Sequence, residues 1–120
     1  MASVLAVDDS PSLRKLVVAV LTEAGHTVVE AQDGQEALAM AREHAVQLVV
    51  TDVNMPKMDG LTLVRELRTL APYKYIPILV LTTEMDPAKK AEAKASGATG
   101  WLVKPFDPNK LQSTIRRVLG

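Results

Sequence analysis

Short apolar runs alternate along the chain with longer segments in which apolar residues recur every three or four positions. Four runs are almost wholly apolar and cover residues 4–7, 48–50, 78–81 and 102–103. None of them alternates apolar with polar residues, so each is typical of a parallel strand that is buried on both faces. Residues 27–31 are rich in β-branched side chains but less apolar, which predicts a fifth strand at a sheet edge.

Helices are predicted in the segments between these runs. The clearest pattern repeats at the spacing of one helix face and consists of Leu13, Leu16, Val17, Val20, Leu21 and Ala24. A second such pattern, near the end of the chain, consists of Leu111, Ile115, Val118 and Leu119. Weaker patterns predict helices at residues 35–44, 60–70 and 87–96; in the last of these, Ala88, Ala91 and Ala95 are expected to face the core.

The ends of several predicted helices carry recognisable capping residues. Three helices are expected to begin with a capping side chain and a proline, since proline lacks an N–H and suits the first helical position. These pairs are Ser10-Pro11, Asp86-Pro87 and Asp107-Pro108. Gly25 and Gly97 stand where C-terminal caps are expected. Five strand–helix units are too few to close a barrel, so we predict an α/β fold with an open, doubly wound, five-stranded parallel sheet.

Composition narrows the class of protein further. The length of 120 residues suits one domain, which we expect to cover residues 1–120, and 48% apolar residues suit a folded core. Fourteen basic residues balance fourteen acidic ones, so nucleic acid and membrane surfaces are not expected partners. No apolar run approaches the roughly 20 residues that span a bilayer, and no secretion signal is evident. We therefore expect a cytoplasmic protein. The lack of cysteine excludes thiolate chemistry.

Polar residues follow the predicted strands at their carboxyl ends, where doubly wound sheets place their working site. These residues are Asp8, Asp9, Thr51, Asp52, Thr82, Thr83 and Lys104. Three carboxylates at one edge would repel each other unless a cation lay among them. Oxygen ligands without histidine or cysteine favour a hard ion such as Mg²⁺. Taken singly, however, Asp8 and Asp9 could cap the next helix, and Asp52 could simply begin a loop.

The combination of Asp52 with Lys104 and Thr82 favours phosphoryl chemistry. A carboxylate can attack phosphorus and form an aspartyl phosphate if cations and donors meet the charge on the phosphoryl oxygens. Lys104 supplies an ammonium group, and Thr82 supplies a hydroxyl that can reach a phosphoryl oxygen.

Four motifs in order carry a resemblance that covers the whole chain. They are Asp8-Asp9, Thr51-Asp52-Val53-Asn54-Met55-Pro56 with Asp59-Gly60, Thr82, and Lys104-Pro105-Phe106. The chain resembles the receiver domain of two-component response regulators, most closely the single-domain CheY-like chemotaxis regulators. The resemblance implies a flavodoxin-like, CheY-like sheet with strand order 2-1-3-4-5.

The resemblance also implies a role for each matching residue. Asp52 would accept a phosphoryl group from a histidine kinase, while Lys104 contacts the phosphoryl oxygens and Thr82 acts as the switch hydroxyl. Asp9 and Asp52 would ligate Mg²⁺ directly, Asp8 would act through water, and the Asn54 carbonyl would complete the site. The side chains of Asn54 and Glu84 match positions that tune phosphoryl lifetime. The protein would catalyse only its own phosphorylation and dephosphorylation, and so would not be an enzyme in the usual sense.

The output side of the switch is expected on the fourth helix, fifth strand and fifth helix. Trp101 stands where the family usually has tyrosine, phenylalanine or histidine, which puts the amplitude of the aromatic switch in question. Lys89 and Lys90 lie on the same predicted surface and could meet an acidic partner. The expected partners of this monomer are a histidine kinase, a downstream protein such as a flagellar motor switch component, and a phosphatase.

Other classes of protein compete with this interpretation. A flavin carrier shares the sheet, but Asp8 and Asp9 would repel a cofactor phosphate. An aspartate-dependent phosphatase needs a second acid two residues after the nucleophile, where this chain has Asn54. Two alternatives stay open: a receiver-like interaction module that acts without phosphorylation, and a receiver fragment of a longer response regulator.

Overall fold

The computed structural model describes residues 2–83 and 87–119. Over these residues, strands and helices alternate along the chain as the apolar pattern predicts. The elements are β1 (Ser3–Val7), α1 (Pro11–Glu23), β2 (Thr27–Ala31), α2 (Gly34–Glu43), β3 (Leu48–Asp52), α3 (Gly60–Arg68), the short 3₁₀ helix η1 (Ala71–Tyr73), β4 (Ile78–Thr82), α4 (Pro87–Ser96), β5 (Gly100–Val103) and α5 (Pro108–Leu119).

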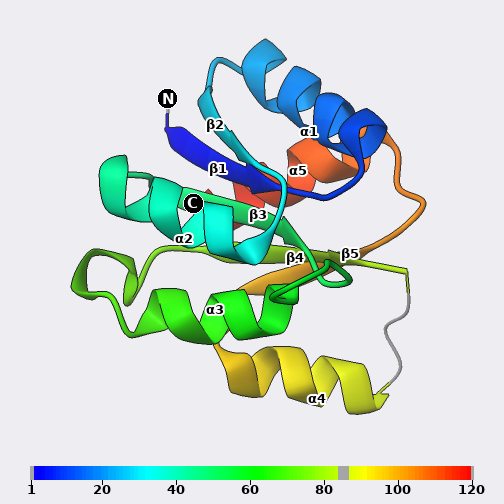
Figure 1. The fold of residues 1–120 in the computed structure, drawn as a ribbon. Coiled ribbons are helices and arrows are strands. Elements are labelled where there is room, and N and C mark those ends of the chain that lie inside the picture. Colours follow the sequence, from blue (N-terminus) through cyan, green and yellow to red (C-terminus); the bar gives the residue numbers. More distant parts are fainter. Residues whose placement is uncertain (1, 84–86, 120) are drawn as a thin grey trace.

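The strands form one parallel sheet in the order β2-β1-β3-β4-β5, so the predicted fold class and strand order are confirmed. Helices α1 and α5 cover one face of the sheet, and α2, α3 and α4 cover the other (Figure 1). Strand β2 lies at one edge, as expected from its weaker apolar pattern, and the four-residue strand β5 lies at the other.

Burial on both faces explains the unbroken apolar runs. In β1, Leu5 and Val7 belong to the core under α2 and α3, whereas Val4 and Ala6 belong to the core under α1 and α5. Because successive side chains of a strand point to opposite faces, a strand covered on both sides is apolar at every position.

The predicted caps agree with the structure where it describes them. The Ser10 side chain accepts from the Leu13 amide at 3.4 Å, and Asp107 accepts from the Lys110 amide at 2.7 Å. Asp86, the cap expected for α4, lies outside the described residues. Helices α2 and α3 also have capping side chains, Asp33 and Asp59, which the apolar pattern did not indicate.

The expected inner face of α4 is wrong. Ala88, Ala91 and Ala95 are exposed, and the buried residues of this helix are Ala93 and Ser96. A helix made mainly of alanine and charged residues has little contrast between its faces, so periodicity alone does not determine its orientation.

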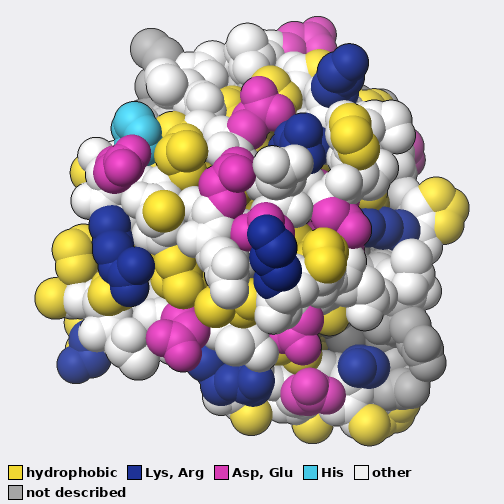
Figure 2. Space-filling model, viewed as in Figure 1, with side chains coloured by type: hydrophobic (Ala, Val, Ile, Leu, Met, Phe, Trp, Pro, Cys, Tyr) yellow, Lys and Arg dark blue, Asp and Glu magenta, His cyan; other side chains and the backbone are white. Residues whose placement is uncertain are grey.

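The surface in view mixes both signs of charge. Figure 2 shows lysine and arginine side chains interspersed with aspartate and glutamate, without a broad region of one sign. Among the described residues, no helix combines the length and the apolar character needed to cross a bilayer.

Candidate functional site

The parallel sheet brings predicted site residues together at the carboxyl ends of its strands. Asp52 ends β3 and Thr82 ends β4, while Asp8 and Lys104 directly follow β1 and β5. The strand registers pair Asp52 with Leu81 and Thr82 with Val103, so neighbouring strands end at the same level. Polar residues that are far apart in the sequence therefore meet at the carboxyl ends of the strands, where the fold was expected to place them.

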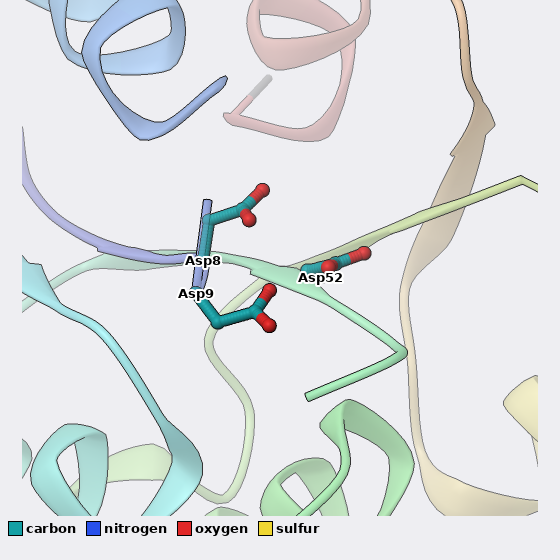
Figure 3. Close-up of side chains that lie close together, drawn as sticks. All are labelled: Asp8, Asp9 and Asp52. Carbon is teal, nitrogen blue, oxygen red and sulfur yellow. The ribbon is translucent and has the colours of Figure 1, made fainter. Parts of the chain in front are cut away.

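Three carboxylates form the centre of this site. Asp8, Asp9 and Asp52 each offer an oxygen atom, and these atoms lie within 4.8 Å of one another (Figure 3). Asp8 and Asp52 are only 2% and 5% exposed, whereas Asp9 is exposed. The Lys104 Nζ atom is 2.8 Å from Asp52 Oδ1 and 3.8 Å from Asp8 Oδ2. The Lys104 ammonium group thus pairs with two of the three carboxylates.

Asp8 has one satisfied and one unsatisfied oxygen. Oδ1 accepts a hydrogen bond from the Ser10 amide at 2.9 Å, while Oδ2 is buried and has no hydrogen-bond partner among the described residues. Burial is the largest cause that raises the pKa of Asp8; the Ser10 hydrogen bond opposes it, and the nearby charge of Asp52 adds to it. A buried carboxylate oxygen without a donor, beside two other carboxylates, fits a hard divalent cation such as Mg²⁺.

Asp52 presents its two oxygens differently. Oδ1 accepts from the Val53 amide at 3.0 Å and from Lys104 Nζ at 2.8 Å. Within the described part of the chain, no hydrogen bond or ion pair reaches Oδ2. The described contacts thus hold the carboxylate by one oxygen alone.

The start of α3 packs closely against the backbone at the end of β3, next to Asp52. Gly60, the first residue of α3, donates its amide to the Val53 carbonyl at 2.8 Å. A Cβ atom at position 60 would lie 2.1 Å from the Asp52 carbonyl oxygen, so a side chain here would displace either α3 or the end of β3. The Asp59-Gly60 motif was noted in the sequence, but this close approach could not be predicted from it.

Arg14 is a contributor that the sequence analysis missed. Its guanidinium donates to the Asp8 carbonyl at 2.6 Å and to Glu30 Oε1 at 3.1 Å, which ties α1 to the turn that carries Asp8 and to β2. No motif marks it, because its main partner is a backbone carbonyl.

The other predicted residues that the structure describes, Thr82 and Asn54, are not members of the acidic cluster. Thr82 is buried, and its carbonyl accepts from the Lys104 amide at 2.7 Å. The Lys104–Pro105 peptide bond is cis. Asn54 is exposed in the loop after Asp52. Glu84 lies outside the described residues.

The predicted output residues lie on β5 and α4. Trp101 pairs with Val80 in the sheet and is partly buried against the core beneath α2, α3 and α4. Lys89 and Lys90 belong to α4. Lys89 Nζ lies 3.9 Å from Glu92 Oε2 and forms an ion pair with it.

Comparison with known proteins identifies the class. The family model for the response regulator receiver domain matches residues 4–116, and the chain belongs to this family. It is a CheY-like receiver domain of two-component systems, a class of signalling proteins rather than of classical enzymes.

Individual relatives place it more closely. The chain is 39% identical over 118 residues to a chemotaxis protein CheY homologue of Campylobacter jejuni, covering 97% of this chain and 91% of the relative. It is 53% identical to the solved chemotaxis response regulator CheY4 of Vibrio cholerae, with a TM-score of 0.95 and 98% of each chain covered. A receiver domain of a Pseudomonas aeruginosa sensor histidine kinase, solved with a magnesium ion coordinated in its active site cleft, is 27% identical with a TM-score of 0.90, over 99% of this chain and 98% of that one.

Proposed function

We propose that this chain is a phosphorylation-dependent switch of a two-component system, in which Asp52 accepts a phosphoryl group from a histidine kinase. The observation that carries the proposal is the geometry of Asp52. Its Oδ1 is fixed by the Val53 amide and Lys104, its Oδ2 has no described partner, and two further carboxylates lie beside it.

The transfer uses groups that the chain supplies. Asp52 Oδ2 attacks the phosphorus atom of a phosphohistidine; a P–O bond forms while the P–N bond breaks. The electron pair of that bond returns to the imidazole nitrogen of the kinase, which takes up a proton. Lys104 then turns from Oδ1 toward the phosphoryl oxygens, and the Thr82 hydroxyl donates to another of them. Attack of water on phosphorus later releases phosphate and restores the carboxylate.

The acidic cluster suits Mg²⁺ as the ion for this reaction. Mg²⁺, when bound, would offset the charge shared by the carboxylates and the phosphoryl oxygens. We assign Asp9 and Asp52 as direct ligands, Asp8 as a ligand through water, and the Asn54 carbonyl as a further ligand. Asp8 Oδ2, which accepts no hydrogen bond from the described residues, supports a cation here, as does the magnesium ion in the similar receiver domain from Pseudomonas aeruginosa.

The output is proposed to leave through the surface formed by α4, β5 and α5. Trp101, Lys89 and Lys90 would contact a downstream partner, which in chemotaxis is a flagellar motor switch component. The similarity to chemotaxis regulators of Campylobacter and Vibrio supports this pathway. We further propose a cytoplasmic monomer whose phosphoryl lifetime is set by Asn54, Glu84 and a phosphatase.

The test is phosphoryl uptake. The protein is incubated with Mg²⁺ and acetyl phosphate and then weighed by mass spectrometry, with EDTA as the metal control. Wild type should gain one acid-labile phosphoryl group, and Asp52→Asn should gain none while remaining folded. Glu66→Gln, which neutralises an exposed carboxylate on α3, should label normally. Undiminished labelling of Asp52→Asn would show that another residue is the nucleophile. A wild type that takes up nothing would favour the interaction module that acts without phosphorylation.

A further inference from the structure

Helix α4 is held unevenly along its length. Its buried residues, Ala93 and Ser96, both lie in its second half, and none of residues 87–92 is buried. Figure 1 places the beginning of α4 on the side where β4 ends and its last turn beside the end of α3. The helix therefore has a loosely packed end near the acidic site and a firmly packed end away from it.

The firm end is closed by a glycine turn. Gly97 has a φ of 104°, its amide donates to the Lys94 carbonyl at 3.1 Å, and the Ala98 amide donates to the Ala93 carbonyl at 3.1 Å. This is the pair of hydrogen bonds that characterises a Schellman motif. It leaves the Gly97 carbonyl free to accept a bond from another element.

Arg68, in the last turn of α3, binds that carbonyl. Its Nε and Nη2 atoms donate to the Gly97 oxygen at 3.1 and 2.7 Å. Its Nη1 atom donates to the Tyr73 and Ile76 carbonyls at 3.0 and 2.6 Å. One planar guanidinium thereby joins the end of α3, the segment before β4 and the turn after α4.

Arg65, one turn earlier in α3, reaches the same end of α4. Its Nη1 atom donates to Ser96 Oγ at 3.0 Å, and that hydroxyl donates in turn to the Glu92 carbonyl at 2.8 Å. Ser96 therefore connects α3 to the backbone of α4 from within the interface.

Both arginines donate to neutral acceptors, namely backbone carbonyls for Arg68 and a serine hydroxyl for Arg65. Within residues 2–83 and 87–119, neither Arg65 nor Arg68 forms an ion pair with a carboxylate. Burial lowers the pKa of Arg68, which reflects the cost of placing this charge away from water. The negative end of the α4 dipole and the carbonyl acceptors offset that cost, because cations are favoured at helix C-termini.

We propose that Arg65 and Arg68 are positioning residues that fix the C-terminal end of α4, so that the phosphoryl-dependent change at Thr82 displaces only the N-terminal half. This inference rests on the proposed function. A helix anchored at one end and loose at the other responds by tilting about the anchor, which alters the outer surface while the start of β5 keeps its place. The Thr99 amide, three residues beyond Ser96, donates to the Ile78 carbonyl at 2.8 Å and holds that start against β4.

The anchor itself is tested without any ligand, by amide hydrogen exchange followed by NMR. In Arg68→Met, the Gly97 and Ala98 amides should exchange at least about tenfold faster than in wild type, since hydrogen bonds to a charged group are lost. The Leu5 amide, in the central part of β1, reports global unfolding. Arg42→Met is the matched control, because Arg42 is exposed on α2 and has no hydrogen bond or ion pair with the described residues. Acceleration of Gly97 and Ala98 no greater than that of Leu5 would show that no local anchor exists.

The directed response is tested with Mg²⁺ and beryllofluoride, which imitates a phosphoryl group. In wild type, amide chemical shifts should change strongly at Ala88–Ala91 and little at Gly97 and Ala98; in Arg68→Met the changes should extend over the whole helix. Arg65→Met, which leaves the Arg68 contacts in place, should show the same trend more weakly. This variant replaces Arg68→Met in the test if Arg68→Met does not fold. Equal shifts along α4 in wild type would overturn the inference. If the amide chemical shifts of Asp9 and Val53 did not respond to beryllofluoride either, the proposed function would fail together with the directed response. Hydrogen exchange in the unliganded protein would still decide whether the anchor exists.

Discussion

Asp8 is the residue at which burial and charge conflict most directly. It is 2% exposed, its Oδ2 has no hydrogen-bond partner, and burial raises its pKa. The folded protein therefore holds a proton on Asp8 more tightly than the unfolded chain does. As pH rises from the ordinary aspartate value of 3.8 through the raised pKa, the folded state must release that proton at a cost, and the free energy of unfolding falls.

Asp8→Asn should remove this loss of stability. In EDTA at neutral pH, we expect the variant to be more stable than wild type, with a difference that disappears as pH falls below the ordinary aspartate value. Urea unfolding over a pH series measures this difference, and Glu66→Gln is the control because its carboxylate is exposed. A constant difference at every pH would show that the gain does not come from the Asp8 charge.

Asp9 is the exposed member of the cluster and is expected to contribute to metal affinity. Asp9→Ala should weaken Mg²⁺ binding by more than about tenfold, because a direct ligand contributes at least as much as an outer-shell partner. Titration with Mg²⁺, followed by the fluorescence of Trp101, measures the affinity in wild type, which we expect in the millimolar range or tighter. Binding of Asp9→Ala at wild-type strength would mean that the ligand assignment is wrong.

At the scale of elements, the packing of α3 against the end of β3 holds Asp52, the proposed nucleophile, in place. Gly60→Ala would put a Cβ atom 2.1 Å from the Asp52 carbonyl oxygen, so either the helix or the strand end must move. We expect a loss of about 1–3 kcal/mol in the free energy of unfolding and slower phosphoryl uptake.

Urea unfolding and labelling with acetyl phosphate measure these two effects. Gly100→Ala provides a matched control, since a Cβ atom there would meet Leu79 Cδ1 at an ordinary 3.7 Å. Wild-type labelling by Gly60→Ala would indicate that the site tolerates displacement of the end of β3.

The elements also show what the sequence could and could not predict. Burial on both faces demands apolar residues at every strand position. The apolar pattern therefore predicted the strands and a sheet covered by helices on both faces. The inner face of α4 was not, because its alanines at 88, 91, 93 and 95 are compatible with more than one orientation.

The site residues likewise fall into those that the sequence could predict and those that it could not. The acidic cluster, Thr82 and Lys104 were predictable because the fold itself gathers the residues at strand ends. Arg14 was not, because its shortest contact is with the Asp8 carbonyl, and a backbone carbonyl is present at every residue and leaves no trace in the sequence. The same reason applies outside the site to Arg68, which binds the Gly97 carbonyl. The roles assigned to the site residues remain predictions until phosphoryl uptake is measured.

At the scale of the whole molecule, the proposed function requires the acidic site to communicate with the proposed output surface. Trp101 lies in β5 beside β4, which ends in Thr82, and its indole is partly buried. Movement of the Thr82 hydroxyl toward a phosphoryl group should bias Trp101 inward by a shift between two populated conformations. Because indole is larger than phenol, the inward conformation should be incompletely populated.

Quenching of Trp101 fluorescence by acrylamide measures this change. With Mg²⁺ and beryllofluoride, quenching should decrease but not disappear, and the decrease should be absent in Asp52→Asn. For a downstream partner, beryllofluoride should raise the affinity of wild type more than that of Trp101→Ala. Tyr75→Ala is a suitable control, because Tyr75 is 88% exposed and lies in the segment before β4. Unchanged quenching, together with equal partner affinity in every state, would require another output surface.

The four-residue length of β5 also affects whether copies of the protein can associate through their sheet edges at high concentration. An edge strand exposes unpaired backbone groups that invite a strand from another chain, and long flat edges promote aggregation. Strand β5 ends one residue before Lys104, and the Pro105 that follows has no N–H to offer. At the opposite edge, β2 carries the exposed charge of Glu30. Neither edge offers a long uncharged template, so copies of this chain should meet through side chains rather than by joining their sheets.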